Sequence, residues 1–304
     1  MGTWPDWKYA EYVEKNASPA DAPELLEPAS EEIDHTWPNI QVTFFSMDDW
    51  MNWYDIVLDD SAFRLFLHRY RREVKTYKEK LLKQFDPIKN NGTGLALLNE
   101  IGRSKDKGVV RIRPNWDWSD IVNAEAKPEK GRDATAQGRP VTLRPNASRG
   151  TGKGTNSTVG YTPEMWGEKG ASKIKAPGYD ADEVLFHELV HASRQLRGVQ
   201  EAVKVRPYYD DMEEYLATVI TNIYMAHNGK TALGGDHGTG TLKDPDHFLD
   251  NVQHVSMTPR DLLRKFKGRQ QDFYNDLAKF GPPRPRFNPV WQLNQEERAG
   301  QHKR

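Results

Sequence analysis

Apolar side chains recur at every third or fourth position through much of the second half of the chain, a spacing that predicts amphipathic helices. The clearest of these runs cover residues 181–197, 211–226 and 259–280. The first run begins with Asp180 and Glu183 in the spacing of a capping box and ends before Gly198, which favours a left-handed C-terminal cap. We therefore predict two long helices that follow each other in the sequence, and then a third.

Short runs rich in β-branched and aromatic residues predict strands elsewhere in the chain. They cover residues 42–45, 109–112 and 157–161. Residues 123–156 are mostly polar, and within them only residues 141–143 have the composition of a strand. Because helical patterns dominate and the strands are few, we expect an α+β fold, with a helix-rich domain around a small, mostly antiparallel sheet.

The N-terminal part of the chain differs in composition from the rest. Residues 14–30 are rich in Ala, Pro and Glu and show no periodic apolar pattern, so we expect residues 1–39 to form a poorly ordered leader or linker. The first residues also lack the basic and apolar regions of a Sec signal peptide. Residues 40–304 are then expected to form one folded domain.

Composition excludes several classes of protein and of site. A formal net charge of −1 argues against a general nucleic-acid binder, and no apolar run is long enough for a membrane span. The chain has no cysteine, which excludes disulfides, thiolate ligands and cysteine nucleophiles. Any metal site must therefore be built from His, Asp and Glu side chains, and the chain has nine histidines.

The predicted helix 181–197 contains a His-Glu-x-x-His motif formed by His187, Glu188 and His191. Residues four apart project from the same face of a helix, so both imidazoles can bind one zinc ion at about 2.0–2.1 Å. Glu188 lies one position further round the helix, beside the metal, where it can accept a proton from zinc-bound water as general base.

A catalytic zinc ion needs a third protein ligand and an open position for water. The positions that would hold the glycine and third histidine of a metzincin both hold arginine, which excludes that subclass. The predicted helix 211–226 instead offers the adjacent acids Glu213 and Glu214. Glu214 shares its face with small residues that permit close helix packing, and Glu213 lies nearer the apolar face. Periodicity leaves both acids open, and we favour Glu214.

Two segments carry a resemblance to a known group of proteins. The sequence HELVHASRQLRG and the later EEYLATVITNIY together resemble the glutamate-ligand zincins of bacterial effectors and toxins, especially the NleD-type effector metallopeptidases. Clostridial neurotoxin light chains share the HELxH motif and a later glutamate pair. In that wider group the ligand is the second glutamate, which corresponds to Glu214. The resemblance covers about residues 80–290, and only the two helix motifs are specific.

The resemblance implies a zincin-like α+β fold that holds one Zn²⁺ per chain and acts as an endopeptidase. It implies a virulence factor, secreted without a Sec signal peptide, that cleaves a protein substrate in the cytoplasm of a target cell. A secretion chaperone or secretion apparatus is the further partner that it implies, and we expect no nucleic-acid partner. The alternative is a non-catalytic binding or delivery module that has no zinc or a structural zinc site, closed by a fourth ligand such as His237.

Two further sets of residues are candidates for substrate contacts. One set offers a hydrogen-bond donor that could stabilise an oxyanion opposite the zinc ion: Tyr208, Tyr209 and His237. Zincins bind their substrates as a strand added to the edge of a sheet, and the other set forms the candidate strand for this contact: Thr158, Val159, Gly160 and Tyr161.

Overall fold

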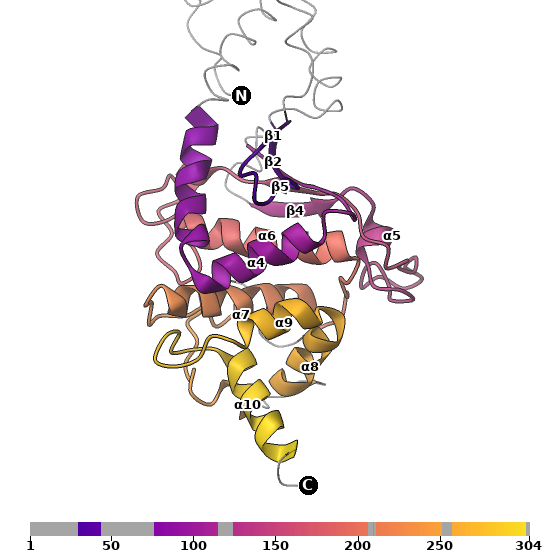
Figure 1. Ribbon diagram of the computed structural model, residues 1–304, viewed down its shortest axis with the longest axis vertical. Coiled ribbons are helices and arrows are strands. Elements are labelled where there is room, and N and C mark those ends of the chain that lie inside the picture. Colours follow the sequence, from indigo (N-terminus) through magenta and orange to yellow (C-terminus); the bar gives the residue numbers. More distant parts are fainter. Residues whose placement is uncertain are drawn as a thin grey trace, which may run out of the picture.

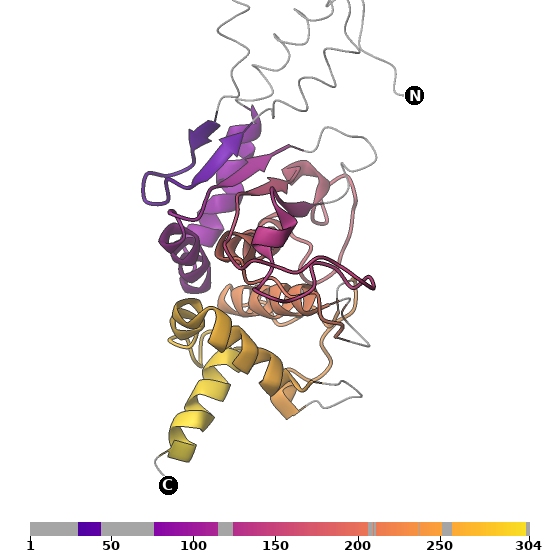
Figure 2. The same cartoon turned by 90° about the vertical axis from the view of Figure 1, so that its right-hand side faces the viewer.

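The computed structural model describes residues 30–43, 76–114, 124–205, 209, 211–236, 238–250 and 257–301. A small sheet lies towards one end of these residues, helices α4 and α6 pack beneath it, and α7 follows as the next layer (Figure 1). Figure 2 shows the C-terminal helices at the end opposite the sheet. None of the helices in the described part of the chain is both long and apolar enough to cross a membrane.

The sheet has five strands in the order β1-β2-β3-β5-β4. Their bounds are β1 Ser30–Glu32, β2 Ile40–Thr43, β3 Val110–Arg113, β4 Glu125–Pro128 and β5 Ser157–Gly160. The outer pairs β1–β2 and β4–β5 are antiparallel, whereas the inner pairs β2–β3 and β3–β5 are parallel. The expected α+β class is confirmed. The sheet is mixed rather than mostly antiparallel, because long crossover connections such as the helices between β2 and β3 allow parallel pairing.

The first strands show where the described fold starts. Residues 30–39 were expected to belong to the leader, yet β1 pairs with β2 and the side chains of Trp37 and Asn39 are buried. Asn39 donates a hydrogen bond of 2.7 Å to the carbonyl of Ile101 in α4, which ties this segment to the helical layer. The rest of the expected leader, residues 1–29, lies outside the described residues.

The helices agree closely with the apolar periodicity in the centre of the chain and less closely near its end. The described helices comprise a helix over residues 76–89 and α4 Gly92–Arg103, α5 Gly131–Ala134, α6 Ala181–Arg197, α7 Met212–His227, α8 Pro259–Arg269, α9 Gln271–Leu277 and α10 Pro289–Gln301. Helix α6 has the predicted bounds. The helix predicted over 259–280 is two helices that meet at Gln270, and α10 was not predicted.

Helix α6 occupies the centre of the fold. It packs against β3, β4 and β5 of the sheet, against α4 beside it and against α7 in the next layer, so both of its faces are covered (Figure 1). Leu185, Leu189 and Leu196 are completely buried in the resulting core. The rings of Phe186 and Tyr224 stack with centroids 4.4 Å apart and join α6 to α7. This packing holds α7 alongside the helix that carries the His-Glu-x-x-His motif.

Both ends of α6 have the caps that the sequence predicts. Asp180 and Glu183 form the capping box, in which a carboxylate oxygen of Glu183 accepts a hydrogen bond of 3.2 Å from the backbone N–H of Asp180. Gly198 adopts a left-handed conformation with φ of 67° at the C-terminal end. A Cβ atom there would lie 2.5 Å from the backbone nitrogen of Gly154, so the position excludes any side chain for two independent reasons.

We predict that Gly198→Ala destabilises the protein more than Gly229→Ala. Gly229 follows α7 with φ of 83°, and a Cβ atom added there would meet nothing within 4 Å, so its substitution costs only the backbone strain of about 1–2 kcal/mol. Gly198→Ala adds the clash with the backbone of Gly154 to the same strain. Chemical denaturation of both variants measures the difference. Equal losses of unfolding free energy in the two variants would show that the close packing around Gly198 contributes nothing to stability.

Candidate metal centre

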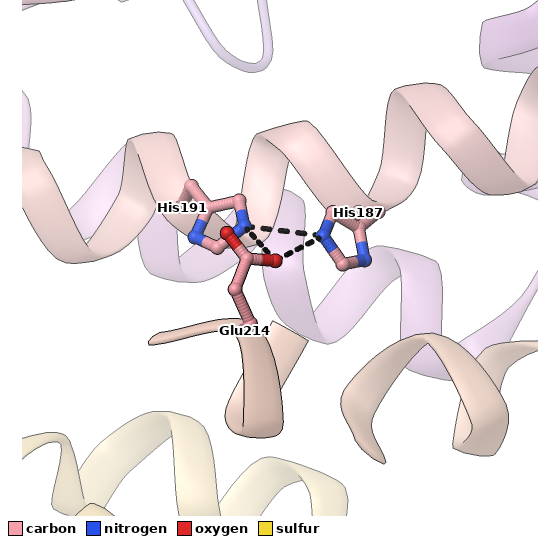
Figure 3. Close-up of side chains that lie close together, drawn as sticks. All are labelled: His187, His191 and Glu214. Carbon is pink, nitrogen blue, oxygen red and sulfur yellow. Dashed lines mark hydrogen bonds and ion pairs between the residues drawn. The ribbon is translucent and has the colours of Figure 1, made fainter. Parts of the chain in front are cut away.

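The two histidines of the motif lie one turn apart on α6, and Glu214 extends from the first turn of α7 towards both of them (Figure 3). The Nε2 atoms of His187 and His191 are 3.1 Å apart. The Oε2 atom of Glu214 lies 3.3 Å from the first and 3.4 Å from the second. All three side chains therefore direct one ligand atom to the same point, with these atoms within 4.8 Å of one another.

The start of α7 explains the direction of Glu214. Asp211 is the N-cap, and its Oδ1 atom accepts hydrogen bonds from the backbone N–H groups of Glu213 and Glu214 at 2.8 and 3.2 Å. Such a cap satisfies two of the free N–H groups of the first turn and fixes its backbone. The carboxylate of Glu214 is thereby held on the side of α7 that contacts α6.

Glu213 is directed elsewhere and has a different partner. Its Oε2 atom accepts a hydrogen bond of 2.6 Å from Nε of Arg194, and its Oε1 atom accepts one of 2.9 Å from Nη2 of the same residue. Oε1 also accepts the backbone N–H of Glu201 at 2.8 Å. Of the two acids that the periodicity leaves open, the structure brings Glu214 to the histidines and engages Glu213 in a buried ion pair.

The three clustered side chains interact strongly with one another. Burial would lower the pKa of His191, but the carboxylate of Glu214 opposes this effect and raises the pKa from 6.5 to about 9. Burial would raise the pKa of Glu214, yet the two histidines hold that pKa well below its usual range. The cluster thus stabilises a proton on His191, and a metal ion that binds there must displace it, which makes metal affinity pH-dependent.

Glu188 lies between two cavities beside this cluster. A cavity of about 120 Å³ is lined by Glu188 and His187 together with Trp166, Tyr179 and Val184. A second cavity of about 350 Å³ is lined by Glu188 with His191 and Glu214, and by residues of β4. The Glu188 residue is buried, with 8% of its surface exposed. Each cavity is therefore bordered by Glu188 and by at least one member of the cluster.

Of the three expected oxyanion donors, the described residues include only Tyr209. Its ring packs edge-on against Tyr215 with centroids 5.1 Å apart, and it lines neither cavity. Burial, with a smaller effect from Asp236, raises its pKa well above the usual value, so the hydroxyl stays protonated. Tyr208 and His237 lie outside the described residues.

The expected substrate strand has to be corrected. Thr158, Val159 and Gly160 belong to β5, which pairs with β3 on one side and with β4 on the other, and so offers no free edge. Tyr161 follows the strand and is buried, with its hydroxyl donating to the carbonyl of Ala181. The edge beside the cluster is β4, which the sequence did not predict because its Glu-Ala-Lys-Pro composition has no apolar alternation.

A His-Glu-x-x-His helix whose two histidines face a glutamate on the next helix, beneath a small mixed sheet, defines the class of zincin-like metallopeptidases. The family model of the peptidase M91 effector proteins matches residues 68–259, well over half of the chain. The chain belongs to this family and is a metallopeptidase. Comparisons with curated proteins and with solved structures found no match.

We predict that substitutions of the two adjacent acids on α7 have different consequences. Glu213→Ala leaves Arg194 buried without its carboxylate, which should lower the unfolding free energy of the metal-free protein by about 3–5 kcal/mol. Glu214→Ala removes the candidate third ligand, so its loss of zinc affinity should exceed the roughly 10–100-fold loss typical of outer-shell partners. Denaturation curves and zinc titrations separate the two effects. A larger loss of zinc affinity in Glu213→Ala would contradict the assignment.

Proposed function

We propose that the protein is a zinc endopeptidase in which His187, His191 and Glu214 hold the metal and Glu188 is the general base. The convergence of the three ligand atoms carries this proposal. Tetrahedral ligands at 2.0–2.1 Å from a shared zinc ion lie about 3.3–3.4 Å apart. The observed separations of 3.1, 3.3 and 3.4 Å are close to that value, so the donor set fits zinc in both chemistry and spacing.

The roles of the residues follow from their positions. When bound, zinc lowers the pKa of a coordinated water molecule and polarises the carbonyl group of the scissile bond. Glu188 borders the cluster from both cavities, where its carboxylate can accept the proton of the attacking water and deliver it to the leaving amine. Two imidazoles and one carboxylate leave the fourth position of the metal to water and substrate.

We infer that an extended substrate adds to the outer edge of β4, which has no further partner strand among the described residues. Peptides that bind by strand addition use main-chain hydrogen bonds for affinity and pockets for specificity. Residues of β4 line the cavity that also contains His191 and Glu214, so a peptide paired with β4 would run past the cluster. The smaller cavity, with its aromatic walls of Trp166 and Tyr179, would receive a substrate side chain next to the scissile bond.

We further propose that the protein is secreted by a bacterium and acts on a protein in the cytoplasm of a target cell, where it has an effector or toxin role. The family description as effector protein supports this proposal. Delivery would require a secretion apparatus, with a secretion chaperone as a further partner. The substrate would emerge from a comparison of new protein N-termini in target-cell lysate treated with wild-type protein or with Glu188→Gln.

The alternative function, a binding module with a structural zinc ion, would need a different number of protein ligands at the site. A structural zinc is closed by four protein ligands, whereas within the described ranges three side chains gather around the site. Three ligands match the number that a catalytic zinc takes, and His237, the candidate fourth ligand, lies outside the described residues. Hydrolysis of an unfolded protein by the zinc-loaded chain, together with its metal content, separates the two functions.

We predict that the purified protein contains about one zinc ion per chain, and that His191→Ala abolishes this binding because two ligands cannot hold a catalytic zinc. Removal of zinc with a chelator should lower the melting temperature and abolish hydrolysis, and addition of zinc should restore both. Metal analysis and thermal denaturation provide the measurements. Full zinc occupancy in His187→Ala/His191→Ala would place the metal elsewhere.

A second prediction separates the general base from the ligands. Glu188→Gln should retain zinc and the wild-type fold, because this side chain does not coordinate the metal, while hydrolysis of an unfolded protein falls by about 10²–10⁴-fold. Glu168→Gln is a matched control, since Glu168 forms an exposed ion pair with Lys175 and neither residue lines the two cavities. Near-normal turnover by Glu188→Gln would rule out the proposed mechanism.

A further inference from the structure

Arg194 is a completely buried charge three positions beyond His191 on α6. Besides its two hydrogen bonds to Glu213, it donates from Nη2 to the carbonyl of Val199 at 2.9 Å and from Nη1 to Oε1 of Gln270 at 2.8 Å. A buried guanidinium is stable only when its hydrogen bonds are made inside the protein. Arg194 therefore connects the helix of the histidines to Glu213, the residue next to Glu214.

Gln270 comes from a distant part of the sequence. It lies at the junction of α8 and α9, where its side chain is completely buried. Its Oε1 atom accepts the hydrogen bond from Arg194, and its Nε2 atom donates to Oε1 of Glu100 on α4 at 3.2 Å. Glu100 is itself buried and accepts a second hydrogen bond of 2.9 Å from Arg197 of α6. Gln270 thus links Arg194 of α6 to Glu100 of α4, which a second residue of α6 also holds in place.

Helix α8 is also linked to the carboxylate of Glu213, through Glu201. The backbone N–H of Glu201 donates to Oε1 of Glu213, while the buried carboxylate of Glu201 pairs with Arg269 at 3.0 Å and with Lys265 at 3.5 Å. The family match ends at residue 259, where α8 begins. Both connections to Glu213 therefore reach beyond the segment that defines the family.

We propose that Gln270 is a positioning residue for the metal centre. It holds Arg194 in the orientation that engages Glu213, and the fixed carboxylate of Glu213 keeps the first turn of α7 where Glu214 meets both histidines. The C-terminal helices α8 and α9 are thus part of the construction of the site, although no residue of theirs lies in the cluster. This inference rests on the proposed zinc site, because the effect is on metal binding.

The test uses two substitutions of Gln270 in the full chain. Gln270→Ala removes both hydrogen bonds, and Gln270→Met removes them while it keeps most of the side-chain volume, so packing is preserved in the second variant. Competition with a chelator measures the zinc dissociation constant. The visible absorption spectrum of the Co²⁺-substituted protein reports the geometry of the ligands. Both variants should bind zinc about 10–100-fold more weakly and show an altered cobalt spectrum.

Asn288→Ala is the matched control. Asn288 is also a buried amide in the C-terminal region, and it donates to the carbonyls of Leu277 and Phe280 without any link to Arg194. This variant should lower the melting temperature of the metal-free protein yet keep the wild-type zinc affinity and cobalt spectrum. Only a positioning role predicts that difference, since general destabilisation would affect both variants alike.

Two results would overturn the inference while leaving the proposed function intact. One is wild-type zinc affinity and cobalt spectrum in both Gln270 variants. The other is an equal change in Asn288→Ala. If the wild-type chain binds neither zinc nor cobalt, the proposed metal centre itself is wrong, and the positioning role falls with it.

Discussion

The covering of α6 on both faces is the constraint on which the site depends. A helix packed between a sheet and another helix can carry polar side chains only where each has a partner or borders a cavity. Gln195 meets this demand by accepting from Ser157 at 2.6 Å and donating to the carbonyl of Ala126 at 2.7 Å. Arg194 meets it through Glu213. The histidines and Glu188 satisfy this requirement because they border the cavities. The burial that stabilises the helix therefore gathers its reactive side chains at one place.

These partners also set the relative positions of the elements around α6. Ala126 belongs to β4 and Ser157 to β5, so Gln195 fixes the distance between the active helix and the edge of the sheet. The caps at Asp180 and Gly198 fix the position of the helix along its own axis. The proposed metal ligands, the proposed general base and the edge strand β4 are therefore positioned by one set of helix and strand contacts.

The sequence alone predicted the structural features that depend on residues close together in the chain. The bounds of α6, its caps and the pair of histidines all depend on residues within one helix, and periodicity and capping rules predicted them. The choice between Glu213 and Glu214 depends on Arg194, which lies 19 residues earlier on another helix, and no local pattern contains that information. Strand β4 and the break at Gln270 were missed for the same reason. Pairing with β5 stabilises the first, and buried contacts with Arg194 and Glu100 stabilise the second.

The edge strand β4 has a consequence for selectivity and for self-association. It is four residues long, and Glu125 and Lys127 are exposed on it. Short edges with charged side chains resist pairing with identical edges, which protects the chain from aggregation through this strand. The same shortness limits the number of backbone hydrogen bonds that any incoming peptide can form. If peptides add to β4 as proposed, discrimination among them comes mainly from side chains in the cavities.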